Sequence, residues 1–126
     1  MIAYLTVEQV IELHDEMINR YGGLPGIRDK NLLWSAIDSP KATMFGRELY
    51  PTIYEKASVY LYQIVCNHPF NDANKRTGYA TALVFLDAND AEIGCKKEDL
   101  EDLVLEVAKG KASREAVTSF LRTGKL

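Results

Sequence analysis

The run His68-Pro-Phe-Asn-Asp-Ala-Asn-Lys-Arg-Thr77 is the most distinctive stretch of this chain. It begins with a histidine, a proline and an aromatic residue, and it then gathers a carboxylate, an amide and two adjacent cations. The segment that follows, from Gly78 to Leu86, carries no charge. This change predicts a polar loop that leads into a buried helix, with the polar groups at the helix N-terminus. Backbone N–H groups point outward at that end and attract anions, so the stretch is a candidate phosphate site.

Other segments of the chain show apolar residues at helical spacing together with capping signals. Thr6 and Gln9 have the spacing of a capping box, and Asp29 and Ser113 are N-cap candidates for later helices. Pro51 suits the first position of another helix. The predicted helices cover residues 6–21, 29–37, 51–67, 72–88 and 96–108, with a last helix from residue 113.

The remaining segments predict little regular structure. Lys41 to Tyr50 is the least periodic stretch and predicts a surface loop or short hairpin, which fits a functional lid as well as a plain connector. Ala91 to Cys95 is a candidate extended piece. Thr81 to Leu86 is apolar on nearly every side, which is typical of a central buried helix. The sequence therefore predicts one all-α domain over residues 1–126, with six helices around a central one.

Composition narrows the class of protein. A net charge of −3, from 15 Lys+Arg and 18 Asp+Glu, disfavours a general nucleic-acid binder, whose affinity comes from neutralised phosphates. Cys66 and Cys95 fit neither a metal-ligand spacing nor a disulfide framework. The N-terminus lacks a signal-peptide pattern, and no apolar run is long enough to span a bilayer. We therefore expect a cytoplasmic protein without membrane or direct nucleic-acid binding.

Each polar residue of the run has a chemical and a structural interpretation. His68 has the chemistry of a general base or of a packed helix-end histidine. Asp72 suits an oxygen ligand for Mg²⁺ or an ordinary helix N-cap, and Asn74 suits a hydrogen bond to phosphate or substrate. Lys75 and Arg76 oppose the helix dipole in the first turn, which calls for an anion unless both cations are simply solvated. Together these groups are the parts that phosphoryl or nucleotidyl transfer requires.

The run from His68 to Arg76 resembles the signature of the Fic/Doc superfamily, and specifically of its death-on-curing (Doc) toxin branch. It keeps the histidine, Phe, Asp, Asn and first Arg of the common Fic pattern. Ala73 and Lys75 replace two glycines of that pattern, and Tyr79 stands in place of its last arginine. Further similarity lies in three other runs: Arg20-Tyr-Gly-Gly-Leu-Pro-Gly-Ile-Arg-Asp29, Leu49-Tyr-Pro51 and Ala82-Leu-Val-Phe-Leu86.

The resemblance implies a transferase that uses ATP and Mg²⁺. Fic proteins typically transfer AMP to a hydroxyl, but Lys75 and Tyr79 both count against the nucleotide orientation that AMP transfer needs. The Doc branch looks like a protein kinase that transfers the γ-phosphate to a threonine of elongation factor Tu. Carried over by position, the resemblance makes His68 the base and Asp72 the Mg²⁺ ligand. It makes Asn74, Lys75 and Arg76 the phosphate-binding residues.

The resemblance also implies surroundings for this site. Lys41 to Tyr50 would form a flap that aligns the target peptide, and Arg20 and Arg28 are looser candidates for the rim. A toxin of this kind is paired with an antitoxin whose disordered C-terminal segment folds over the site. Three hypotheses follow: a kinase-like toxin, a Fic-type AMP transferase as runner-up, and a non-catalytic binding module that keeps the fold.

Overall fold

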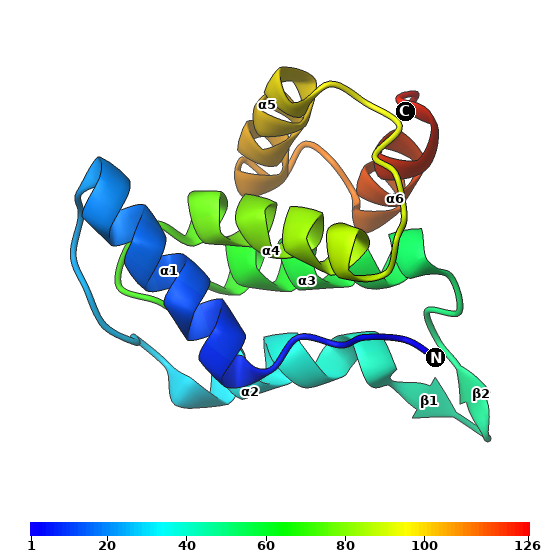
Figure 1. Cartoon of the computed structure of the whole chain (residues 1–126), viewed down its shortest axis with the longest axis horizontal. Helices are drawn as coiled ribbons and strands as arrows, with labels where there is room; N and C mark the ends of the chain where they lie inside the picture. The colour runs from blue at the N-terminus through cyan, green and yellow to red at the C-terminus, as the bar shows by residue number, and fades with distance from the viewer.

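A computed structural model describes all residues, 1–126, and shows six α-helices with one small hairpin (Figure 1). The predicted all-α architecture is thus confirmed. In chain order the elements are α1 (Val7–Tyr21), α2 (Lys30–Asp38), the 3-10 turn η1 (Ser39–Lys41), β1 (Thr43–Met44), β2 (Arg47–Glu48), α3 (Ile53–Asn67), α4 (Asn74–Ala88), α5 (Lys97–Ala108) and α6 (Arg114–Thr123). The longest helices have 15 residues, and none combines the length and the apolar composition that a membrane span requires.

Most helix starts lie where the capping signals place them. Thr6 and Gln9 form the complete capping box of α1, and the side chains of Asp29 and Ser113 accept backbone N–H groups at the starts of α2 and α6. Each bond satisfies a donor that the first helical turn leaves without an intrahelical partner. The α1 helix ends at Gly22. Local sequence therefore determines these boundaries.

Two predicted helix starts were wrong. The α3 helix begins at Ile53 with Thr52 as its N-cap, so Pro51 lies before the helix and is not its first residue. The α4 helix begins at Asn74 and not at Asp72, because Ala73 adopts a left-handed conformation (φ 61°) that no helix can include. The segment from Ala91 to Cys95 pairs with no strand.

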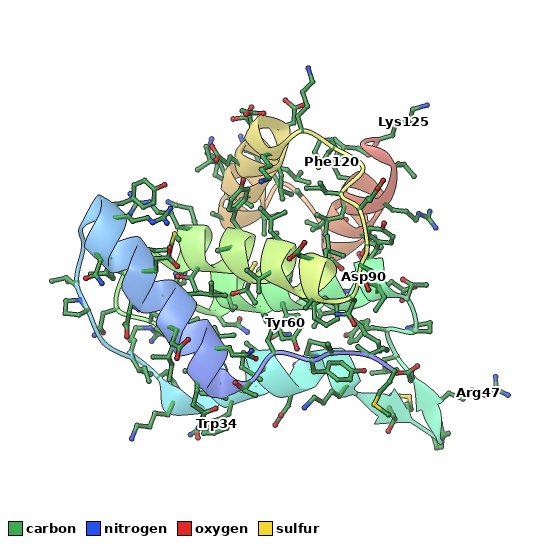
Figure 2. All side chains as sticks on the ribbon, viewed as in Figure 1. Trp34, Arg47, Tyr60, Asp90, Phe120 and Lys125 are labelled. Carbon is green, nitrogen blue, oxygen red and sulfur yellow. The ribbon has the colours of Figure 1, made fainter.

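The α3 and α4 helices lie side by side at the centre, with α1 and α2 on one side and α5 and α6 on the other (Figure 1). Gly78 permits this close contact, because a Cβ atom there would lie 2.7 Å from the Val65 side chain of α3. Tyr60 of α3 is fully buried in the interior (Figure 2). The expectation of burial on every side of Thr81 to Leu86 was wrong at Val84, which is 39% exposed.

The segment from Lys41 to Tyr50 contains the hairpin β1–β2, whose turn residues Phe45 and Gly46 both have positive φ angles. It is anchored by Glu48, whose carboxylate accepts a 2.8 Å hydrogen bond from the buried Lys56 ammonium group. The hairpin precedes α3 and His68 follows it, so the two lie at opposite ends of this helix. Its 15 residues span about 22 Å. Arg47 extends into solvent at the end of the molecule away from the α3–α4 connection (Figure 2). The expectation that this segment forms a flap over the site is therefore wrong.

Candidate functional site

The loop of residues 68–73 connects α3 to α4 and begins and ends in left-handed backbone. His68 has a φ angle of 50° and Ala73 one of 61°. Left-handed conformations are costly for residues other than glycine, asparagine and aspartate, and they persist only where the surroundings enforce them. The loop is therefore held by contacts from outside it.

The segment that leads into α2 supplies many of these contacts. The Pro69 carbonyl accepts the main-chain N–H groups of Arg28 and Asp29, at 2.8 and 3.0 Å, and the Asn71 N–H donates to the Gly26 carbonyl at 3.1 Å. The Phe70 side chain, 1% exposed, anchors the same stretch in the core. Residues 26–29 therefore hold the loop through main-chain hydrogen bonds, as a neighbouring strand would.

Asn74 closes the loop from the helix side. Its amide oxygen accepts the Phe70 N–H, and its amide nitrogen donates to the Phe70 carbonyl, both at 3.0 Å. The side chain is buried and holds the backbone turn. One amide hydrogen remains for a ligand, so phosphate binding by Asn74 stays a prediction, and its observed contacts are structural.

The N-terminus of α4 is open. Ala73, its N-cap, has no side chain that bonds the first turn, so backbone donors there remain available. Lys75 and Arg76 follow on exposed positions, and neither forms an ion pair with a carboxylate. The Arg76 guanidinium instead lies over the Tyr21 ring, 4.9 Å from its centroid. Free N–H groups and two unpaired cations create a local positive site on an acidic protein.

Asp72 lies beside this helix end with both carboxylate oxygens oriented by backbone. Oδ1 accepts the Ala73 N–H at 2.8 Å, and Oδ2 accepts the Leu24 N–H at 3.1 Å. These two hydrogen bonds, with a smaller contribution from the Arg76 cation, hold the pKa of Asp72 below its ordinary value. The carboxylate is therefore ionised near neutral pH and keeps lone pairs free.

The donor set is compatible with one kind of metal site only. No three His, Cys, Asp or Glu side chains are grouped as a metal would require, so the protein builds no complete cage. Mg²⁺ commonly binds through one or two carboxylates together with substrate phosphates. The exposed Asp72 carboxylate beside an uncapped helix N-terminus fits that arrangement.

His68 presents its exposed side chain to the same region, while its main chain is clamped from behind. The Arg28 guanidinium donates to the His68 carbonyl at 2.6 Å and to the Asn67 carbonyl at 2.7 Å. Arg28 thus holds the last turn of α3 and does not line the cavity. Arg20, the other rim candidate, pairs with Glu16 on α1 at 2.7 Å and also lies outside this cavity.

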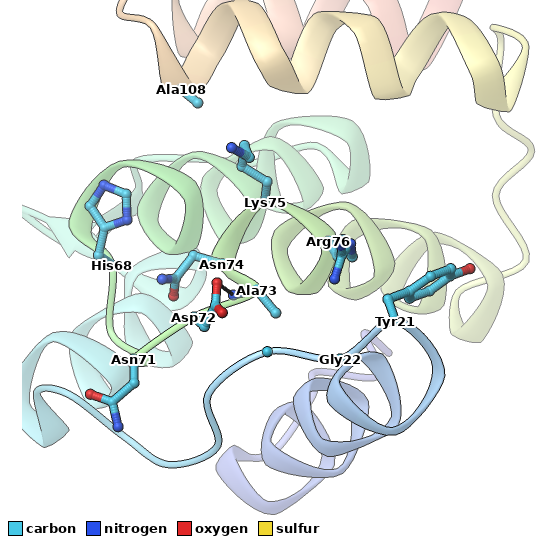
Figure 3. A pocket seen from close by; sticks show the side chains of 11 residues that line it. Tyr21, Gly22, His68, Asn71, Asp72, Ala73, Asn74, Lys75, Arg76 and Ala108 are labelled. Carbon is cyan, nitrogen blue, oxygen red and sulfur yellow. Dashed lines mark hydrogen bonds between the residues drawn. The ribbon is translucent and has the colours of Figure 1, made fainter.

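A cavity of about 570 Å³ brings together five predicted residues, namely His68, Asp72, Asn74, Lys75 and Arg76. Figure 3 shows the α4 N-terminus between the loop that carries Asp72 and the end of α1, with Ala108 of α5 nearby. Six further lining residues had been given no individual role at the site: Tyr21, Gly22, Gly23, Asn71, Ala73 and Ala108. The Gly22-Gly23 pair could have indicated a close approach of backbone to the site. A Cβ at Gly23 would lie 2.7 Å from the Asp72 carboxylate, so only glycine fits there.

A second cavity of about 670 Å³ shares Tyr21, Lys75 and Arg76 with the first. Arg20 and Tyr79 line this neighbouring cavity. Burial, with the Glu101 carboxylate as a smaller cause, raises the pKa of Tyr79 above its ordinary value. The Tyr79 hydroxyl is therefore neutral at physiological pH and carries no charge toward the shared cations.

Comparison with known proteins agrees with the sequence signature. A family model for the Fic/DOC family matches residues 4–86. The "Protein kinase doc" of Escherichia phage P1 is 37% identical over 119 residues, which is 94% of this chain and 93% of that protein. The "Toxin Doc" of Mycolicibacterium smegmatis is 34% identical over 103 residues, 80% of this chain and 79% of that protein. The chain belongs to the Fic/DOC family.

Proposed function

We propose that this chain is a Doc-like toxin of a toxin–antitoxin system. In this proposal it transfers the γ-phosphate of ATP to a threonine hydroxyl of elongation factor Tu and so blocks translation in the cytoplasm. The single observation that carries the proposal is one cavity in which His68, Asp72 and two unpaired cations surround an uncapped helix N-terminus. The names of the two relatives, a protein kinase and a toxin, support the same function.

In the proposed reaction His68 is the general base. Its imidazole takes the proton of the acceptor hydroxyl, the hydroxyl oxygen bonds to the γ-phosphorus, and the bond to the β–γ bridging oxygen breaks. The products are the phosphorylated threonine and ADP. Arg28 contributes indirectly, because its two hydrogen bonds to the Asn67 and His68 carbonyls fix the backbone from which the imidazole projects.

The phosphates would be held at the N-terminus of α4. Backbone N–H groups there orient anions, the Arg76 guanidinium can bond two phosphate oxygens at once, and Lys75 adds a point charge. Tyr21 supports the Arg76 side chain from the α1 side. Asp72 would hold Mg²⁺, which when bound neutralises phosphate charge as it builds up in the transition state.

Two residues favour γ-phosphate over AMP transfer. Lys75 replaces a glycine of the Fic pattern and adds a long side chain to the cavity that the nucleotide would occupy. Tyr79 replaces the last arginine of that pattern, and its neutral hydroxyl cannot neutralise a phosphate. AMP transfer to a protein hydroxyl is the alternative, and a non-catalytic binding module of this fold is the third.

The proposed partner is an antitoxin whose disordered segment folds over the site. The end of α1 is a suitable docking position, because Tyr21 is 61% exposed and lines both cavities. Such a segment would compete with the nucleotide for Lys75 and Arg76.

Transfer assays with labelled ATP test the proposal. Purified protein is incubated with Mg²⁺, elongation factor Tu and either γ-labelled or α-labelled ATP. We expect label on elongation factor Tu from the γ-position only, on a threonine, and its loss in His68→Ala and Lys75→Gln. Lys125→Gln, which removes the same charge beyond the end of α6 (Figure 2) and outside the cavity, should retain full activity.

Each other result selects another hypothesis. Label from the α-position alone indicates AMP transfer. No transfer of either label, together with no growth inhibition on expression and no effect of His68→Ala, indicates a non-catalytic module.

A further inference from the structure

We infer that His14 of α1 is a positioning residue for the loop that carries Asp72, an inference that rests on the proposed function. His14 is 1% exposed, and its Nε2 lies 2.9 Å from the Asp72 carbonyl oxygen. Its ring stacks on that of Phe70, with centroids 3.9 Å apart and planes 8° from parallel. One buried side chain thus contacts the loop through both its polar edge and its face.

The hydrogen bond determines which nitrogen carries the proton. A carbonyl oxygen can only accept, so Nε2 of His14 must be the donor. The other ring nitrogen, Nδ1, lies 3.5 Å from the Asp15 carboxylate at the surface. An apolar side chain at position 14 would remove the donor that satisfies the partly buried Asp72 carbonyl, which is more costly than the bond itself is worth.

This contact is one of several that the N-terminal segment makes to Asp72. His14 binds its carbonyl, the Leu24 N–H binds its Oδ2 at 3.1 Å, and Gly23 leaves room for the carboxylate. Both the main chain and the side chain of Asp72 are therefore held by α1 and the loop that follows it. Groups held by rigid elements keep the sub-ångström alignment that transfer reactions need.

Two substitutions separate positioning from simple packing. His14→Phe keeps the stacked ring and removes the donor. His14→Gln removes the ring and keeps an N–H donor three bonds beyond Cβ, as Nε2 is in histidine. Positioning predicts that His14→Phe lowers kcat for phosphate transfer about tenfold or more, with a smaller change in KM for Mg·ATP, and that His14→Gln recovers most of it. A packing role predicts the opposite order, with the phenylalanine variant close to wild type, and that order would overturn the inference.

A second measurement does not depend on catalysis. Amide hydrogen exchange of Leu24 reports its bond to the Asp72 carboxylate, and the Gly22 amide, bonded to the Ile18 carbonyl at 2.8 Å, is the matched control. In His14→Phe we expect Leu24 to exchange about tenfold faster, as the loss of one ordinary hydrogen bond implies, with Gly22 unchanged. Equal Leu24 exchange in the variant and wild type would contradict the inference.

Controls separate this inference from the proposed function. Val117→Ala, in the buried face of α6, lowers global stability and should leave both readouts unchanged. If wild-type protein transfers no phosphate, the proposed function fails and the exchange measurement alone decides the role of His14. If His14→Phe does not fold, His14→Gln decides. Positioning requires the Leu24 amide of His14→Gln to exchange at the wild-type rate, and faster exchange in this variant would overturn the inference.

Discussion

The carboxylate of Asp72 accepts the main-chain N–H of Leu24 at 3.1 Å, across 48 residues of sequence. This bond joins the exit of α1 to the loop before α4. It places a carboxylate beside the helix N-terminus without using it as a helix cap, because the left-handed Ala73 lies between the carboxylate and the helix. Asp72 therefore stays exposed and ionised next to the two cations of α4.

Replacing Asp72 by asparagine should make stability less dependent on pH. The backbone donors of Ala73 and Leu24 lower the folded-state pKa of Asp72 below its ordinary value of 3.8. The ionised carboxylate therefore stabilises the fold above pH 3.8, and this stabilisation is lost as pH falls through the folded-state pKa. Urea unfolding should show wild type to be more stable than Asp72→Asn near neutral pH, with a difference that shrinks in acid. A difference that stays constant with pH would contradict the assigned hydrogen bonds.

Arg28→Lys should impair phosphate transfer although it preserves charge. The planar guanidinium donates to two carbonyls at the end of α3, at 2.6 and 2.7 Å, whereas an ammonium group cannot reproduce this fork. We expect kcat to fall about tenfold because the backbone beneath His68 loosens. Arg20→Lys is the matched control, since its exposed pair with Glu16 contributes little. Equal activity of both variants would show that Arg28 does not position His68.

Ala73→Gly should leave stability unchanged or raise it, unlike most glycine substitutions. The left-handed conformation of Ala73 costs about 1 kcal/mol, which glycine avoids, while the greater freedom of glycine in the unfolded chain offsets about 0.5–1 kcal/mol of that gain. Ala80→Gly, within α4, is the control and should cost about 1 kcal/mol. Thermal unfolding of the two variants measures the contrast. An equal loss in both would show that position 73 is not left-handed in solution.

The two partners of the ion pair between the buried Lys56 and the exposed Glu48 should differ in how much stability their replacement costs. Burial alone would lower the pKa of Lys56, but the bond to the Glu48 carboxylate, together with the nearby Tyr4, raises it above its ordinary value. Glu48→Gln leaves a buried ammonium without its counter-charge and should cost about 2–3 kcal/mol. Lys56→Met, which fills the same space, leaves only the 45%-exposed Glu48 carboxylate to be solvated and should cost less. Denaturant unfolding measures both, and a larger loss for Lys56→Met would refute this account.

Helix positions and the chemical inventory of the site could be read from sequence because both depend on short-range patterns. The capping box at Thr6 and Gln9 and the caps at Asp29 and Ser113 involve residues three positions apart. The run from His68 to Arg76 likewise gathers its own base, carboxylate and cations. The errors at Pro51 and Asp72 arose because a competing cap and a left-handed residue each moved a helix start by two residues.

The sequence by itself determined an all-α chain of six helices with a polar, anion-attracting turn before an uncharged helical segment. Only the tertiary structure decided what the neighbours of that turn do. The Arg28 guanidinium binds the His68 carbonyl, and the Asn74 side chain holds the Phe70 backbone. The buried His14 contacts the Asp72 carbonyl. The hairpin lies at the far end of α3 from the turn. The physical reason is that hydrogen-bonding capacity belongs to a side chain, whereas its partner is fixed by how helices far apart in sequence pack.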